Sequence, residues 1–166
     1  MSRRPNLCSI GTAAIVSVVL ALSLAPTTAA ASQLASPTGT RTSRLAVGGD
    51  AWTLFRATNA SRGRFGVPKL QLDRALSTIA RRHSMAMARS GDLFHTTDVD
   101  VYLHGITWHT WGENVGYTSQ DVAAMQQAFM DSPPHRGNVL NGAFRQVAIG
   151  AVRVDGTLWV TVFFYA

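Results

Sequence analysis

A carboxylate and an amide stand side by side at Glu113 and Asn114, and imidazoles lie upstream at His95 and downstream at His135. Each of these side chains lies near glycine or proline, residues that are typical of turns. Two imidazoles and a carboxylate that converge can bind a ligand, hold a divalent metal or move protons. Alternatively, Glu113 and Asn114 only hydrogen-bond the backbone of a glycine-bounded loop. The spacing alone is compatible with both.

Other histidines are expected outside this group. His83 lies on the apolar face of a predicted helix, where a histidine is usually a satisfied core residue. His104 and His109 fall in an irregular, acid-rich segment at 92–111 and are expected to belong to a polar surface loop.

The elements that must position these side chains begin with helices. Apolar spacing predicts a helix from a cap at Asp50 to about Arg62, and a clearer one at about 74–90, with Asp73 as N-cap and Gly91 at its end. Thr118, with Asp121 three residues on, predicts the start of a third helix. Ser132 before Pro133 predicts the N-cap of a short helical turn that carries His135 and Arg136.

In the C-terminal third the spacing of apolar residues changes from the helical period to alternation. Val147, Ile149 and Ala151 alternate with other residues, and Asp155-Gly156 is a strong hairpin signal. The stretch from Leu158 to Tyr165 is rich in aromatic and β-branched residues, as expected for a covered central strand. Helices followed by an antiparallel hairpin predict an α+β domain with helices layered on a sheet.

The N-terminus predicts export. Residues 1–31 combine Arg3 and Arg4, an apolar run and an alanine-rich cleavage site, as in a secretory signal peptide. Residues 32–49 are predicted to be a flexible linker, and 50–166 the folded domain. The single cysteine, Cys8, lies in the signal, so the mature chain has no disulfide. We expect a secreted, extracellular monomer that is not an integral membrane protein after processing.

The net charge of the mature chain limits the classes of binding partner to consider. Loss of the signal leaves 15 − 2 = 13 basic residues against 9 acidic ones, a net charge of +4. The sequence lacks a stripe of basic residues interleaved with aromatic ones, the pattern that would indicate nucleic-acid binding. The excess charge favours either anionic wall polymers or lipid headgroups, or simply a solvated surface.

At this point the residues resemble a known family. The chain is similar to the CAP superfamily (cysteine-rich secretory proteins, antigen 5 and plant pathogenesis-related proteins), and most of all to its short bacterial secreted branch. The matching pieces run in order across about residues 52–164: Asn59 with Arg62, Gly66-Val67-Pro68, Leu72-Asp73, His83-Ser84, Met87-Ala88, Phe94-His95, Gly112-Glu113-Asn114-Val115, Ser132-Pro133, His135-Arg136, Asn138-Val139-Leu140, Phe144, Ile149-Gly150, and Gly156 with Trp159.

The resemblance implies a three-layer α-β-α sandwich with a central antiparallel sheet, and a cleft with a polar floor. Carried over to this chain, the ligand-binding cleft comprises His95, Glu113, Asn114, Ser132, His135 and Arg136. Some members bind zinc or another divalent metal, which implies a metal set of His95, His135 and Glu113. This chain has Ser132 near the position of a second glutamate of eukaryotic members. It also has Phe129 in place of a usual tryptophan and Pro134 in place of a usual glycine.

Three functions remain open, and binding ranks first. In the first, the cleft binds a small molecule, a lipid or a cell-wall component. In the second, a zinc-dependent, peptidase-like hydrolase uses Glu113 as its base. Zinc on two histidines needs Glu113 as a third ligand, however, and then no base remains; a helix-capping Ser132 is also occupied by backbone donors. In the third, the polar cluster is only structural.

Overall fold

The computed structural model describes residues 48–166. The predicted signal peptide and residues 32–47 of the predicted linker lie outside the described residues. The elements follow in the order α1 (Gly49–Arg64), β1 (Gln71–Leu72), α2 (Arg74–Ser90), α3 (Asp100–Leu103), β2 (Trp111–Thr118), α4 (Val122–Asp131), α5 (Pro133–Leu140), β3 (Gln146–Val154) and β4 (Thr157–Tyr165).

The sheet is built around the C-terminal hairpin. Its strand order is β1-β3-β4-β2, with antiparallel pairing of β3 with β4 and of β4 with β2. Asp155 and Gly156 form the hairpin turn with φ of 48° and 78°, as the Asp-Gly signal predicts. The two-residue β1 pairs with β3 in parallel. The sheet is therefore antiparallel except at one short edge, and β2 forms the other edge.

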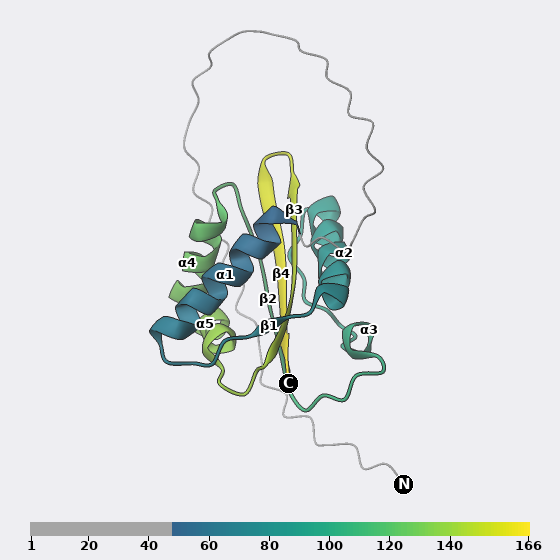
Figure 1. Ribbon diagram of the computed structural model, residues 1–166. Coiled ribbons are helices and arrows are strands. Elements are labelled where there is room, and N and C mark those ends of the chain that lie inside the picture. The colour runs from purple at the N-terminus through teal and green to yellow at the C-terminus, as the bar shows by residue number, and fades with distance from the viewer. Residues whose placement is uncertain (1–47) are drawn as a thin grey trace, which may run out of the picture. The chain divides into compact units, whose positions relative to one another are not determined.

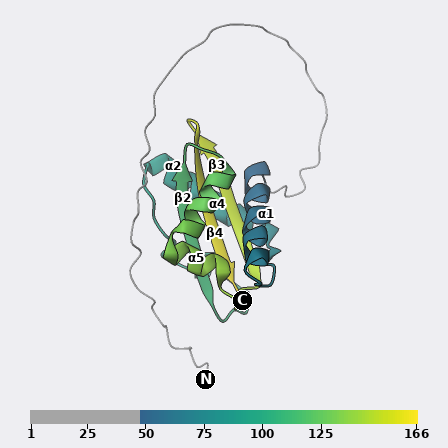
Figure 2. The same ribbon diagram turned by 90° about the vertical axis from the view of Figure 1, so that its left-hand side faces the viewer.

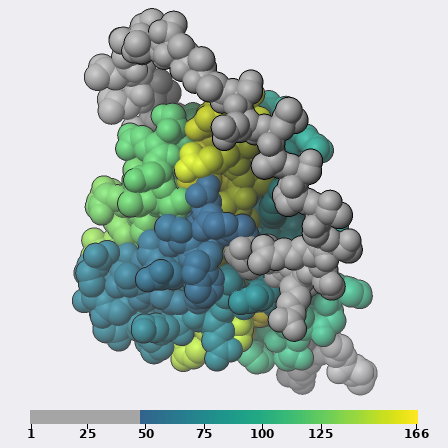
Figure 3. All heavy atoms as spheres, turned by 45° about the horizontal axis from the view of Figure 1, so that its top comes forward, coloured from purple at the N-terminus to yellow at the C-terminus, as the bar shows by residue number. Residues whose placement is uncertain are grey.

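Helices cover both faces of this sheet. Figure 1 shows α1, α4 and α5 on one face and α2 with α3 on the other, and Figure 2 looks onto the face that carries α1, α4 and α5. Figure 3 shows the atoms of α1 and α4 on the same side of the molecule, with the β3–β4 hairpin beside α4 at the top. Three apolar clusters result: Ile149, Val160 and Phe164 belong to the one under the first layer, and Ala148 and Phe163 to one under the second. Met87 of α2 packs with Val115 and Trp159 in the third. The α+β, three-layer α-β-α sandwich is confirmed.

The local signals around α2 are also confirmed. The side chain of Asp73 accepts a hydrogen bond from the Leu76 N–H at 2.9 Å, as an N-cap does. Gly91 ends the helix in the left-handed conformation with φ of 77°. The sequence therefore defines both ends of the helix that carries His83.

Other boundaries were wrong. Thr118 ends β2, and the cap of α4 is Asp121, whose carboxylate accepts from the Ala124 N–H. The first helix begins at Gly49, and Asp50 lies in its first turn and pairs with Arg153 at 2.8 Å instead of capping. The segment 92–111, expected to be irregular, contains α3. Among residues 48–166, no helix has both the length and the apolar character needed to cross a membrane.

Candidate functional site

Glu113 and Asn114 lie in the edge strand β2 and not in a loop, which corrects the expectation from the glycines around them. Because successive side chains of a strand point to opposite faces, Glu113 faces α2 and Asn114 faces α5. The pairing register places Glu113 opposite Phe163, whose side chain belongs to the core under α2 and α3. The segment that follows α2 contacts this strand through His95 and Thr96.

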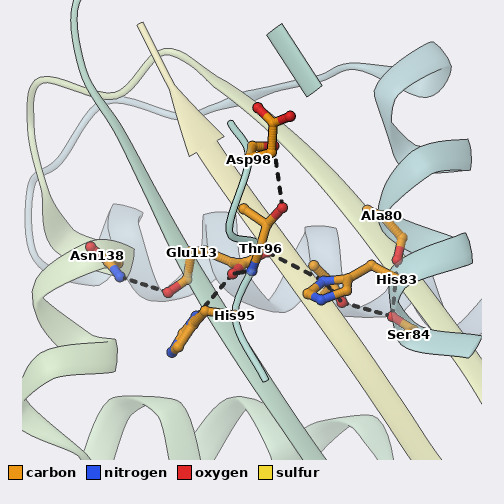
Figure 4. A network of polar contacts seen from close by, with 9 residues as sticks. Ala80, His83, Ser84, His95, Thr96, Asp98, Glu113 and Asn138 are labelled. Carbon is orange, nitrogen blue, oxygen red and sulfur yellow. Dashed lines mark hydrogen bonds and ion pairs between the residues drawn. The ribbon is translucent and has the colours of Figure 1, made fainter. Parts of the chain in front are cut away.

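The Glu113 carboxylate is the centre of the site. Its side chain is 1% exposed. Oε2 accepts hydrogen bonds at 2.9 Å from both Nδ1 of His95 and the backbone N–H of Thr96, and Oε1 lies 3.4 Å from Nδ1 of His83 (Figure 4). A buried charge is tolerated only when partners of this kind surround it. We call Glu113, His83, His95 and Thr96 the His–Glu cluster.

These partners determine the protonation of the carboxyl group. Burial alone would raise the pKa of Glu113, but hydrogen bonds from His83, His95 and the Thr96 N–H outweigh burial and place the pKa below its ordinary value of 4.5. Glu113 is therefore a carboxylate at neutral pH and can only accept hydrogen bonds. When His95 is neutral, its Nδ1 must carry the proton that Glu113 accepts, and its Nε2 then offers a lone pair.

His83 is the residue that sequence reasoning missed. It lies on the inner side of α2, where its Nδ1 is 3.4 Å from Oε1 of Glu113 and 3.4 Å from the Thr161 hydroxyl. Its Nε2 is buried and has no hydrogen-bond partner within residues 48–166. It is thus not the satisfied core histidine expected there. The signal available in the sequence was a histidine on an apolar helical face, which does not distinguish a core residue from a partner of Glu113.

The other face of β2 carries an amide network. Asn114 donates to the main-chain oxygen of His135 at 3.0 Å, and Asn138 donates to the Asn114 side-chain oxygen at 2.8 Å. Asn138 also donates to the main-chain oxygen of Glu113 at 3.1 Å. These bonds tie α5 to the edge strand, and the last of them gives the Glu113 carbonyl of that strand a partner. The buried Asn114 therefore positions α5 through partly buried hydrogen bonds.

His135 lies at the start of α5, where its ring packs on Phe129 with centroids 5.3 Å apart. Its Nδ1 is 2.8 Å from the Ser132 hydroxyl. Ser132 is the N-cap residue by position, but its side chain makes no capping bond, so the expectation that backbone donors occupy it was wrong. Burial, and then the charge of His95, lower the pKa of His135 below its ordinary 6.5. His135 is consequently a neutral imidazole at neutral pH.

The remaining predicted residue lies to one side. Arg136 is exposed and its guanidinium sits over the Phe65 ring, 4.8 Å from the centroid. His104 and His109 are exposed, as expected for residues outside the site. The structure thus joins His95 with Glu113, Ser132 with His135, and Asn114 with the backbone of His135.

Two surface hollows lie elsewhere on the domain. One of about 350 Å³ is lined by residues of α4 and α5, including Met130, Arg136 and Leu140. The other, of about 390 Å³, lies against α1 and is lined by Phe55, Arg56 and Lys69 among others. Neither of them is lined by a member of the His–Glu cluster.

A bound metal ion needs several donor side chains that converge on one point. Within residues 48–166, no three His, Cys, Asp or Glu side chains are grouped so that they could hold a metal ion. Oε2 of Glu113 already accepts hydrogen bonds from His95 and from the Thr96 N–H. As arranged here, His95, His135 and Glu113 do not fit a divalent cation, and the metal set stays a prediction.

Comparisons with known proteins agree with this architecture. The model of the cysteine-rich secretory protein family, CAP, matches residues 55–164. The uncharacterized protein YkwD of Bacillus subtilis is 31% identical over 112 residues, which are 64% of this chain and 43% of that protein.

Solved structures include an extracellular protein containing an SCP domain from Bacillus anthracis, with a TM-score of 0.61 and 27% identity over 70% of this chain and 40% of that one. A cysteine-rich secretory protein from Staphylococcus aureus gives 0.57 and 26% over 70% of this chain and 38% of its own. This chain spans less than half the length of each of these three proteins. With its sandwich fold and the family match over most of the described residues, the chain belongs to the CAP family of cysteine-rich secretory proteins.

Proposed function

We propose that this CAP domain is an extracellular binding protein, and that the exposed side of the His–Glu cluster contacts a small molecule, a lipid or a cell-wall component. Export is supported by the signal-like residues 1–31 and by the extracellular character named for the Bacillus anthracis relative. The whole protein's ligand is part of the same proposal, because the matched relatives are longer chains.

One observation carries the proposal: a buried carboxylate holds an exposed imidazole. The Glu113 side chain is 1% exposed, whereas that of His95, bonded to it at 2.9 Å, is 41% exposed. In Figure 4 the far nitrogen of the His95 ring points away from Glu113. With Nδ1 held by Glu113, the Nε2 lone pair is oriented for a donor from outside. A fixed acceptor at a surface costs a ligand little reorganisation.

Exposed aromatic side chains stand on the same two segments as His95 and Glu113. Phe94 precedes His95 and packs edge-on against His83, with ring centroids 5.0 Å apart. Trp111 lies two residues before Glu113 on the same face of β2 and stacks on Phe163. The ligand that suits these groups has a hydroxyl or amide N–H donor beside an apolar portion. Wall glycopeptides and lipids with hydroxyl groups both have that character.

The test is binding of soluble muropeptides, released from purified peptidoglycan, to the folded domain by calorimetry. Replacement of His95 by alanine should weaken binding about tenfold, since a lost hydrogen bond with its desolvated partner costs about 1–3 kcal/mol. His104→Ala is the matched control, an exposed histidine nine residues away outside the cluster. A dispersed long-chain alcohol serves as a second probe, for the lipid.

Equal affinities of the parent and His95→Ala for every probe would contradict a binding role of this surface. Mass spectrometry of the same muropeptides before and after incubation addresses the hydrolase alternative. If the parent produces shortened peptides and the Glu113→Gln variant does not, the protein is a hydrolase and the binding proposal is wrong.

A further inference from the structure

The outer side of α2 carries four exposed arginines: Arg74, Arg81, Arg82 and Arg89. At 100° per residue they fall within a sector of about 100°, and the opposite side of the helix carries the residues that are buried on the sheet. In Figure 1, α2 lies at the outside of the domain, over one face of the sheet. We call these four residues the arginine face.

No acidic side chain neutralises the arginine face. The helix contains no Asp or Glu, so pairs at i±3 and i±4 are absent within it. Of the ion pairs formed by the described residues, none includes these arginines; the only arginine among them is Arg153. Arg74 also sits in the first turn, where a cation is unfavourable to the helix dipole. Only Arg89, in the last turn, is placed favourably for the dipole, so helix stability does not account for the other three charges.

We propose that the arginine face binds a linear polymer of the cell envelope that carries phosphate groups. The guanidinium group is always charged, is weakly hydrated and pairs with phosphate through two parallel hydrogen bonds. Arg74 and Arg89 are 15 residues apart, or about 22 Å along the axis, with Arg81 and Arg82 midway. A row of cations of this length matches an extended chain with repeated negative charges.

A polymer fits this face better than a bilayer does. Binding in a membrane interface gains most from large apolar side chains next to the cations. The exposed large apolar residues of the domain are Trp52, Phe65, Phe94, Val101, Trp111 and Tyr117, and none of them lies on α2. The exposed apolar residues of the helix are the small Ala75 and Ala86. Charge is therefore the main attraction that this face offers.

The arginine face is distinct from the ligand surface proposed above. The helix also carries His83, but on the side that faces Glu113, away from these arginines. Substituting the arginines removes no contact of the His–Glu cluster. Failure of one proposal therefore leaves the other standing.

The experiment measures binding of inorganic polyphosphate to the mature protein by fluorescence anisotropy at several salt concentrations. Four neutralised phosphates predict an affinity loss on the order of 100-fold between about 50 and 200 mM salt. The variant R74Q/R81Q/R82Q/R89Q should bind at least about tenfold more weakly at the lower salt and lose most of this dependence. The matched control is R56Q/R64Q/K69Q/R136Q, which removes the same charge from exposed positions on the other layer of the sandwich and should retain both.

Thermal unfolding of both variants establishes that they are folded, and glutamine is as good a helix former as arginine. Equal losses in the two variants would show a net-charge effect and overturn the proposal. Tighter binding to vesicles of anionic phospholipid than to polyphosphate, abolished by the same four substitutions, would assign the face to a membrane and overturn it as well.

Discussion

Glu113 and Asn114 are neighbours in β2, yet their side chains serve opposite layers of the sandwich. Glu113 accepts from Nδ1 of His95 on the α2 side, and Asn114 donates to the backbone of His135 on the α5 side. A single strand edge therefore links the two imidazoles that the sequence places 40 residues apart. Because the strand alternation creates this division, the pair acts on both layers only if the register of β2 on β4 is kept.

Glu113→Gln should destabilise the domain by about 1–3 kcal/mol. The carboxylate accepts from His95 and Thr96 through Oε2 and keeps Oε1 3.4 Å from His83 Nδ1, whereas the glutamine amide has one oxygen and would direct N–H groups at one of these donors. The melting temperature should fall by several degrees, at about 4 °C per kcal/mol for a domain of this size.

The control for that substitution is Asp92→Asn, an exposed acid in the segment after α2. Its melting temperature should stay within about 2 °C of the parent, as for an isolated surface change. If Glu113→Gln also melts like the parent, the cluster contributes nothing to stability.

Acid should destabilise the domain in two ranges of pH. The folded-state pKa of Glu113 is lowered from 4.5 and that of His135 from 6.5, so in each case the unfolded chain binds more protons in the range between its two pKa values. Stability therefore rises with pH through each range, and falls on acidification below 6.5 and again below 4.5. Melting temperatures between pH 8 and about 3 would measure both losses.

Two variants separate these ranges. Glu113→Gln removes the carboxyl group, so its difference from the parent should shrink as the pH falls below 4.5. His135→Gln should flatten the curve below 6.5 and leave the more acid part. Parallel curves for all three proteins would contradict both assignments.

Arg62→Ala should cost about 3 kcal/mol or more. Arg62 is fully buried, and its guanidinium donates to main-chain oxygens of Pro68 (2.7 Å), Val139 (2.8 Å), Asn141 (3.0 Å) and Phe144 (3.3 Å). Its partners are all carbonyl groups, and each one left buried and unpaired costs about 1–3 kcal/mol. Denaturant unfolding of this variant measures the loss.

Arg62→Lys gives the sharper comparison, because it keeps the charge but has three donors without the planar fork. It should lie between the parent and the alanine variant. Arg64→Ala is the control, since Arg64 is exposed and bonds only the Ser61 hydroxyl. A parent-like unfolding midpoint for Arg62→Ala would show that water replaces the guanidinium without cost.

Elements with local signals could be predicted from the sequence. The ends of α2 follow from a capping aspartate and a left-handed glycine, and the β3–β4 turn follows from Asp155-Gly156. Each depends on a few adjacent residues, so no tertiary information is needed. The strand character of 111–118 was missed because Gly112 and Gly116 look like turn residues. In the structure a Cβ at Gly112 would lie 2.7 Å from Oδ1 of Asn138, so this glycine allows the close approach of α5.

The site could be predicted only in part, for the same reason. Family-like motifs indicate His95, Glu113 and His135, but the partners of Glu113 depend on how α2 lies across the sheet. His83 reads as a core residue until β2 is placed next to it, and Thr96 contributes a backbone N–H that no side-chain pattern reveals. For Ser132 the local pattern correctly predicts the N-cap position but not the partner of the side chain. Its hydroxyl group forms a hydrogen bond with the His135 ring instead of with a backbone N–H.

The last prediction concerns the contact that places α2, and with it His83, on the sheet. Gly150 of β3 lies so close to the helix that a Cβ there would overlap main-chain atoms of Ala80 and Arg81. Gly150→Ala must therefore push α2 outward, at a cost of about 3 kcal/mol or more. Ala80→Gly should not rescue it, because the overlap is with the backbone.

Gly137→Ala is the opposite case: a helical glycine with open space around its Cβ position, where alanine should stabilise by about 0.5–1 kcal/mol. Chemical denaturation of these variants beside the parent measures the expected loss and the expected gain in stability. A tolerated Gly150→Ala would mean that α2 can shift freely and that the His83–Glu113 distance is not set by this contact.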